Sequence, residues 1–126
     1  MELVRAAFEA LDQGDLRSAV EFMDPSIEWD VSRVLLDQEV ILGRDAVLAY
    51  LEETFAALPF AHEDHEFIDV AERVCVLASI RGRGSGSGIE LAHPVGYVMT
   101  VRNGAIIQSC FFGDHDAALK AVGLAE

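Results

Sequence analysis

The first half of the chain places its hydrophobic residues at the spacing of α-helices. Three amphipathic helices are predicted. The first two span residues 3–11 and 16–23, and the third is opened by Gly43-Arg44-Asp45 and has its apolar stripe over residues 47–58. Gly14 is placed to end the first of them, because glycine adopts the left-handed conformation that often closes a helix. Between the second and third helices, residues 27–31 alternate between apolar and polar positions, which predicts a short strand.

From residue 62 onward the period changes to two. Four strands are predicted, over residues 62–70, 74–82, 88–101 and 105–113, and a closing helix over 114–122. Asn103-Gly104 between the last two strands is a strong hairpin signal. Helices come first and strands last, so the pattern predicts an α+β fold in which helices pack on a mainly antiparallel sheet.

The composition narrows the class of protein. With 126 residues, 52% of them hydrophobic, the chain is predicted to be a single domain over residues 1–126 and not disordered. The net charge of −13 argues against nucleic acid and anionic membrane surfaces as partners. No apolar run approaches the roughly 18 residues of a membrane-spanning helix. Two cysteines, Cys75 and Cys110, form no disulfide framework, and a cytoplasmic location is expected.

The negative charge is unevenly spread. Residues 1–72 hold 18 acidic residues against four arginines, whereas Glu90 is the only carboxylate between residues 73 and 113. The strands of the second half therefore offer almost no carboxylate for catalysis, and the acidity is expected to serve solubility.

Several short motifs resemble those of one superfamily. The motifs are Gly14-Asp15-Leu16, Trp29, Gly43-Arg44-Asp45-Ala46-Val47, the hairpin over residues 98–104 and the closing stretch over 114–124. The chain thereby resembles the nuclear transport factor 2-like superfamily, and within it the SnoaL-like branch of polyketide cyclases and ketosteroid isomerase relatives. This resemblance implies a cystatin-like cone, in which a strongly curved sheet wraps the helices and encloses a pocket. It also implies a homodimer formed through the convex face of the sheet.

The resemblance implies an acid–base group inside the cone, and ketosteroid isomerases carry a carboxylate base on the first strand. The equivalent position here is Trp29, with Asp30 one residue further on. Neighbouring residues of a strand face opposite sides, so if Trp29 lines the pocket, Glu28 and Asp30 point away from it.

The strand over residues 88–101 carries the candidate catalytic residues. Its odd positions form an apolar face on which His93 and Tyr97 are the only polar members. An imidazole moves protons near neutral pH, and a phenol donates a hydrogen bond to a developing enolate. The alternative is that both are structural core residues, and Pro94 interrupts the alternation beside His93.

Other side chains are expected to line the pocket. On the last strand the even positions are predicted to face inward, as the hairpin of the superfamily implies. Together with residues from the other elements, the predicted lining is Trp29, Phe55, Met99, Gln108, Cys110 and Phe112.

Three further patterns are not interpreted as functional sites. His62 and His65 lie in a charged stretch where strand geometry places them on opposite sides, so no metal site is predicted. Arg81 lacks the neighbouring acid that limonene-epoxide-hydrolase relatives use to activate water. The Arg/Gly/Ser tract over residues 81–88 lacks the end of a phosphate-binding loop and is interpreted as a hairpin loop.

Two classes of function remain open. The first is a cofactor-independent isomerase or cyclase that moves a proton in a small hydrophobic, carbonyl-bearing molecule, with His93 and Tyr97 as its catalytic groups. The second is a non-catalytic module that binds a hydrophobic ligand. An epoxide-hydrolase-like enzyme and a protein-interaction domain are weaker alternatives.

Overall fold

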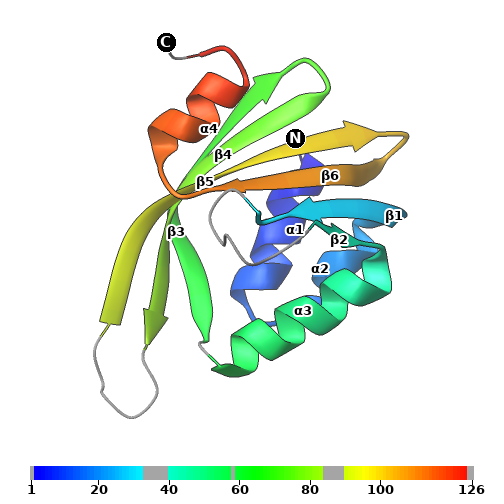
Figure 1. Ribbon diagram of the computed structural model, residues 1–126, viewed down its shortest axis with the longest axis vertical. Helices are drawn as coiled ribbons and strands as arrows, with labels where there is room; N and C mark the ends of the chain where they lie inside the picture. The colour runs from blue at the N-terminus through cyan, green and yellow to red at the C-terminus, as the bar shows by residue number, and fades with distance from the viewer. Residues whose placement is uncertain (1, 33–39, 58, 84–89, 125–126) are drawn as a thin grey trace.

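The computed structural model describes residues 2–32, 40–57, 59–83 and 90–124 (Figure 1). The helices are α1 (Glu2–Asp12), α2 (Leu16–Glu21), α3 (Arg44–Ala57) and α4 (His115–Ala121). The strands are β1 (Met23–Asp30), β2 (Ile41–Leu42), β3 (Phe60–Val70), β4 (Arg73–Arg83), β5 (Glu90–Arg102) and β6 (Ala105–Phe112). The predicted α+β order is confirmed. Of the hairpin loop predicted over residues 81–88, residues 81–83 belong to β4 instead, and residues 84–88 lie outside the described residues.

The first strand begins earlier than predicted. Residues 24–26 lie between the helix predicted over 16–23 and the strand predicted over 27–31, but β1 already begins at Met23 and includes them. The pairing of β1 with β6 is irregular between Met23 and Glu28, and Pro25, which has no N–H to donate, lies in this interruption. The second helix is correspondingly shorter and ends at Glu21.

Short polar contacts fix the ends of the helices. Gly14 follows α1 with a φ of +77°, a conformation that glycine adopts without strain. The carboxylate of Asp15 then accepts a hydrogen bond from the Ser18 N–H and caps α2. Asp114 caps α4 in the same way, through the N–H of Ala117.

The six strands form one sheet in the order β2-β1-β6-β5-β4-β3, in which only β1 and β6 are parallel neighbours. Asn103 and Gly104 turn β5 into β6 with positive φ angles at both positions, which confirms the predicted tight turn. This arrangement places β5, the strand with the candidate catalytic residues, inside the sheet between β4 and β6.

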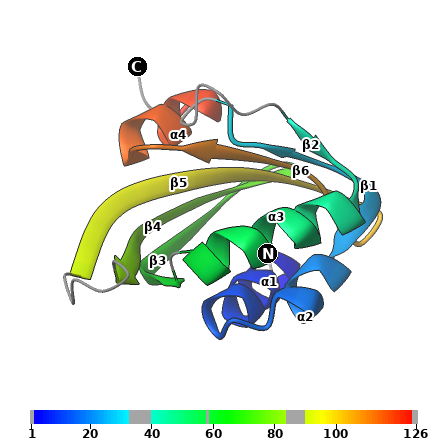
Figure 2. The ribbon, with the colours of Figure 1, turned by 60° about the horizontal axis from the view of Figure 1, so that its bottom comes forward.

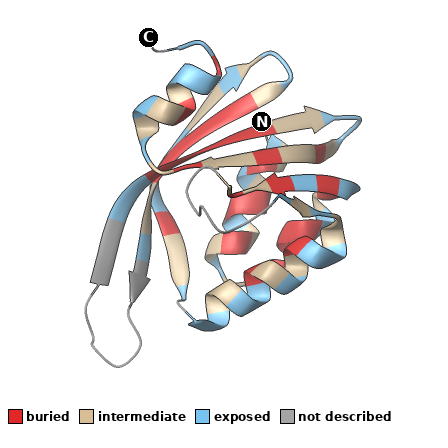
Figure 3. Ribbon diagram, viewed as in Figure 1, coloured by how far each residue is buried: buried red, intermediate tan, exposed pale blue. Residues whose placement is uncertain are grey.

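The sheet curves around the N-terminal helices (Figure 2). Helices α1, α2 and α3 cover one face of the sheet, here called the inner face, and α4 lies on the opposite, outer face. Each face has its own buried cluster, and the larger one includes Phe8, Trp29 and Tyr97 on the inner face. The cluster beneath α4 includes Cys75, Phe112 and Ala118. Figure 3 shows buried residues concentrated in the middle of the sheet and on the helix surfaces that meet it.

A β-bulge in β6 reverses the expected orientation of its side chains. Thr100 pairs with Gln108, whereas the next residue, Val101, pairs with Ile106, so Ile107 is an extra residue. The expectation that even positions face inward therefore holds for Ile106 and is wrong beyond the bulge. From there the inner face carries Ser109 and Phe111, the cross-strand partners of Met99 and Tyr97.

A second bulge lies in β3, between Glu63 and Glu66. Asp64 there has a φ of +55°, a conformation that aspartate tolerates better than most residues. The extra residue overturns the prediction that His62 and His65 face opposite sides, because both side chains reach the same carboxylate, that of Asp12.

Among the described residues, no helix combines the length and the apolar character needed to cross a membrane.

Candidate functional site

The hydroxyl of Tyr97 is a buried polar group of the candidate site. Tyr97 projects from β5 into the inner cluster and is only 5% exposed. Its ring lies 5.1 Å from that of Phe8, 5.0 Å from that of Phe111 and 6.5 Å from that of Trp29, measured between centroids. Its hydroxyl oxygen lies 2.8 Å from Nε2 of His62, so the buried phenol has a hydrogen-bond partner.

His62 joins this hydroxyl to a carboxylate. Its side chain is fully buried, and its Nδ1 lies 2.6 Å from Oδ1 of Asp12. The backbone N–H of His62 donates to the same oxygen at 2.9 Å. Because an ionised carboxylate only accepts hydrogen bonds, Nδ1 carries a proton. In a neutral imidazole Nε2 is then the acceptor, and the Tyr97 hydroxyl donates to it.

The Asp12 carboxylate also forms a hydrogen bond with a second histidine. Nε2 of His65 lies 2.9 Å from Oδ2 of Asp12. Asp12, the last residue of α1, lies on a surface groove of about 530 Å³ between α1 and β3. The groove is lined by Arg5, Phe8, Glu9, Asp12, Gln13, His62, His65 and Phe67. These contacts form a continuous chain of hydrogen bonds from the apolar interior to the groove. The chain is here called the polar chain, and it consists of Tyr97, His62, Asp12 and His65.

Burial keeps the Tyr97 hydroxyl neutral. It raises the pKa of Tyr97 far above the ordinary value, and the negative charges of Asp12 and of an ionised Tyr50 raise this pKa further. Tyr97 therefore acts at neutral pH as a phenol that both donates and accepts a hydrogen bond, not as a free phenolate.

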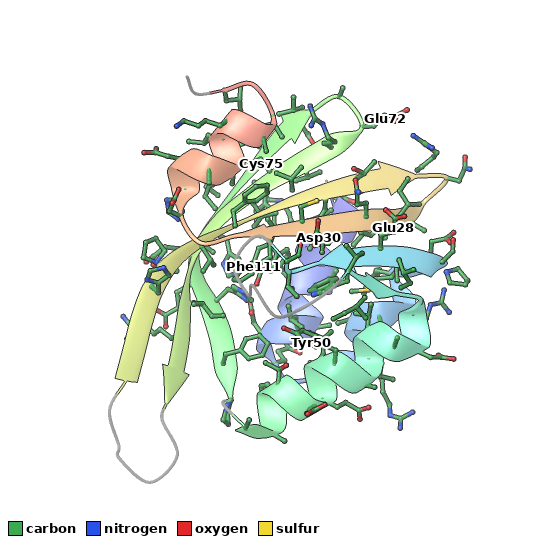
Figure 4. All side chains as sticks on the ribbon, in the orientation of Figure 1. Glu28, Asp30, Tyr50, Glu72, Cys75 and Phe111 are labelled. Atoms are coloured by element: carbon green, nitrogen blue, oxygen red, sulfur yellow. The ribbon has the colours of Figure 1, made fainter. Side chains whose placement is uncertain are left out.

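Aromatic side chains surround the inner end of the polar chain. Phe55 and Phe60 contact each other at 5.6 Å between ring centroids. These two residues, Tyr50 and Phe111 are half-buried and pack against the inner cluster, and Figure 4 labels Tyr50 on α3 and Phe111 on β6. Each of the four is therefore partly accessible to solvent.

The predicted site residues fall into two groups. Trp29, Met99 and Tyr97 belong to the inner cluster, and Phe55 packs against it. His93 is exposed, and its Nε2 bonds at 2.9 Å to the carbonyl oxygen of Gly113 instead of reaching Tyr97.

The last three members of the predicted lining lie on the outer side of the bulged strand. Phe112 belongs to the cluster beneath α4, and Cys110 packs against that cluster. Gln108 donates to the carboxylate of Glu28 at 3.3 Å. Phe112, Cys110 and Gln108 are therefore oriented away from Tyr97.

Because of the bulge, the inner face of β6 carries Ser109, which was not among the predicted site residues. Ser109 pairs with Met99 on β5 and with Trp29 on β1, and it is 1% exposed. Its hydroxyl makes no hydrogen bond to the described part of the protein.

Asp12 and His62 were not among the predicted site residues either, although the sequence contains one indication for Asp12. Val4, Phe8 and Asp12 follow one another at intervals of four residues, so the carboxylate continues the apolar stripe of the first helix. An acidic residue on such a stripe needs a buried polar partner, and His62 supplies it.

Comparisons with known proteins agree with this fold. The sequence profile of the SnoaL-like domain family matches residues 4–109. No curated protein matches the chain. A candidate polyketide cyclase from Xanthomonas campestris pv. campestris has a similar structure, with a TM-score of 0.81 and 20% identity, over 97% of this chain and 95% of that one.

Two other solved structures are similar. A hypothetical protein from Catenulispora acidiphila with a ketosteroid isomerase-like fold, in complex with trimethylamine, has a TM-score of 0.79 and 15% identity, over 98% of this chain and 93% of that one. TerC, co-crystallised with polyporic acid, has a TM-score of 0.76 and 20% identity, over 96% and 95% of the two chains. At these identities the similarity shows the cone fold alone.

Proposed function

Since this chain belongs to the SnoaL-like domain family, we propose that it binds a small hydrophobic, carbonyl-bearing molecule and moves a proton within it, as an isomerase or cyclase does. One observation carries the proposal. A neutral tyrosine hydroxyl inside the apolar cluster is bonded to an imidazole, and a carboxylate holds the other nitrogen of that imidazole. The general class of function in this proposal, a small-molecule-binding domain of the cyclase or isomerase type, agrees with the family and with the structural neighbours.

The polar chain allows a balanced proton transfer. The Tyr97 oxygen accepts a proton from an acidic C–H or O–H of the ligand while its own proton moves to Nε2 of His62. His62 becomes an imidazolium, whose charge the Asp12 carboxylate stabilises through Nδ1. Return of the proton to a different atom of the ligand completes an isomerisation, with no net change in the protein.

The surroundings favour this transfer. Trp29, Phe8 and Phe111 pack around Tyr97, and apolar walls exclude water and strengthen the hydrogen bonds of the buried groups. A carbonyl ligand that reaches Tyr97 would lie against Phe111, whose half-buried ring is 5.0 Å from that of Tyr97. As the enolate forms, hydrogen bonding from the Tyr97 hydroxyl would stabilise the charge.

The proposal keeps the catalytic role predicted for Tyr97 and gives the role predicted for His93 to His62. The reason is geometric, since Nε2 of His62 bonds to the Tyr97 hydroxyl whereas Nε2 of His93 bonds to a backbone carbonyl.

Deuterium exchange tests the proposal. Cyclic and aromatic ketones are incubated with the protein in D₂O, and deuterium at the carbon next to the carbonyl is measured by NMR. The wild-type protein is expected to accelerate exchange for at least one ketone, and Tyr97→Phe and His62→Gln to reduce the acceleration by 10²-fold or more, on the order of a general acid–base contribution. His93→Gln is the matched control and is expected to keep it. Absence of acceleration, or full acceleration in Tyr97→Phe, overturns the proposal.

A binding module without catalysis is the second candidate. It is favoured by the orientation of β1, where Trp29 faces the interior while Glu28 and Asp30 pair with Gln108 and Cys110 of the outer face. No carboxylate of this strand is then available beside Tyr97. Ligands that raise the melting temperature but are recovered without isotope exchange or rearrangement would support this second function.

Three further expectations belong with the proposal. We expect residues 1–126 to act as one domain, to form a homodimer through the outer face of the sheet, and to reside in the cytoplasm. Both cysteines are free thiols, which suits a reducing compartment. Light scattering coupled to size-exclusion chromatography tests the dimer, because a monomeric mass at all concentrations contradicts it.

A further inference from the structure

One carboxylate serves two histidines in different environments. The two oxygens of Asp12 bind Nδ1 of His62 and Nε2 of His65, at 2.6 and 2.9 Å. The side chain of His62 is fully buried, whereas that of His65 is 26% exposed and lines the groove. One imidazole therefore faces the Tyr97 hydroxyl and the other faces water.

The bulge in β3 produces this arrangement. Asp64 takes a positive φ, and the extra residue brings His65 to the side of the strand that His62 occupies. The two imidazole centroids lie 6.3 Å apart. His65 also stacks on Phe67 with nearly parallel rings, 5.7 Å between centroids, which holds its imidazole beside Asp12.

The two histidines compete for one negative charge. A single carboxylate balances one imidazolium, and two positive charges at this separation would oppose each other. A proton taken up by His65 would place a positive charge against Asp12 and make His62 a weaker acceptor. When His65 is neutral, the full charge of Asp12 supports an imidazolium at His62.

Other charged and titratable groups surround this pair. From α1, Arg5 and Glu9 line the same groove, and the Arg5 guanidinium lies 4.4 Å from the centroid of the Phe67 ring. From β3, Glu63 forms an ion pair with Arg81 of β4 at 2.6 Å. Tyr97 of β5 bonds to His62, and Tyr50 of α3 lies within electrostatic reach of Tyr97. None of the hydrogen bonds found in the described ranges joins Arg5, Glu9 or Glu63 to Asp12.

We propose that His65 is a positioning residue for the proton transfer. Its protonation at the groove, transmitted through Asp12, sets whether His62 can accept the proton of Tyr97. The catalytic meaning of this inference rests on the proposed function, but the coupling between the two histidines does not require a ligand.

Histidine titration by NMR, on the ligand-free protein with ¹⁵N-labelled imidazoles, tests the coupling. In His65→Gln the side-chain amide still donates to Asp12 but carries no charge, so His62 is expected to gain its proton about one pH unit higher than in the wild type. In His65→Lys a permanent positive charge replaces the imidazole, and His62 is expected to gain its proton at lower pH. His115→Gln, which removes a histidine bonded to the Ala78 carbonyl, is the control and leaves the His62 curve unchanged.

The two substitutions move the His62 midpoint in opposite directions only if the charge at position 65 acts on His62. Equal midpoints in wild type, His65→Gln and His65→Lys overturn the proposal, as do shifts in the same direction. The deuterium-exchange assay is judged separately. If no ketone exchanges but the midpoints separate, the proposed function fails and the coupling stands. If exchange is catalysed but the midpoints coincide, His65 is not a positioning residue.

Discussion

The Tyr97 hydroxyl and the Asp12 carboxylate contact opposite nitrogens of the same buried imidazole, that of His62, at 2.8 and 2.6 Å. The three residues come from β5, α1 and β3, so the curvature of the sheet around α1 is what brings them together. The arrangement has the logic of a nucleophile–histidine–acid triad, with a phenol in the place of the nucleophile.

Removal of the Tyr97 hydroxyl is expected to destabilise the protein. Tyr97→Phe keeps the ring in the inner cluster but leaves Nε2 of His62 buried without its partner. The expected loss is about 1–3 kcal/mol of unfolding free energy, measured by urea denaturation. An unchanged unfolding free energy would show that this hydrogen bond is absent in solution.

Stability is expected to fall at high pH because of Tyr97. The folded protein raises the pKa of this phenol, whereas in the unfolded chain it ionises near its ordinary value of about 10. The stabilising contribution is therefore complete below about pH 10 and is lost as the pH rises further, by up to about 1.4 kcal/mol per pH unit. Urea denaturation from pH 9 to 12 is expected to show a steeper decline in the wild type than in Tyr97→Phe. Parallel declines would contradict the assignment.

Packing of α4 on the sheet depends on Gly96. A Cβ added at this position would lie 2.5 Å from the Cβ of Ala118, far inside contact distance. Gly96→Ala is expected to cost about 1–3 kcal/mol by overpacking. If the clash is the cause, the double variant Gly96→Ala/Ala118→Gly is expected to be more stable than the sum of the two single losses predicts. Strict additivity of the losses would exclude this contact as their source.

The Ser109 hydroxyl is expected to bring no stability to the ligand-free protein. It is buried beside Met99 and Trp29 and has no hydrogen-bond partner among the described residues. Ser109→Ala is therefore expected to raise the unfolding free energy by about 1 kcal/mol, since the desolvated hydroxyl is removed. A loss of stability by thermal and urea denaturation would mean that the hydroxyl is bonded in solution.

The order of helices and strands follows from sequence periodicity because burial dictates it locally. The helix over Glu2–Asp12 and the hairpin at Asn103-Gly104 are two elements that such local patterns predict. The inward orientation of Trp29 agrees with the alternation expected for β1.

The candidate site was harder to predict, since it depends on two inserted residues and on contacts between residues far apart in the sequence. The bulges at Ile107 and near Asp64 each reverse the side-chain alternation of a strand, and periodicity alone does not locate a bulge. Asp12 and His62 meet only after the sheet has curved over α1. The sequence analysis therefore predicted Tyr97 together with His93, whereas the structure bonds Tyr97 to His62 and His93 to a backbone carbonyl.

A crystal structure of the protein with the ketone that exchanges fastest is the most direct measurement of the central claim, that Tyr97 meets the ligand while His62 holds its proton. The account predicts a ligand oxygen or reacting carbon within about 3–3.5 Å of the Tyr97 hydroxyl, with the bonds to His62 and Asp12 retained. A ligand bound in the groove between α1 and β3, or elsewhere without contact to Tyr97, would contradict it.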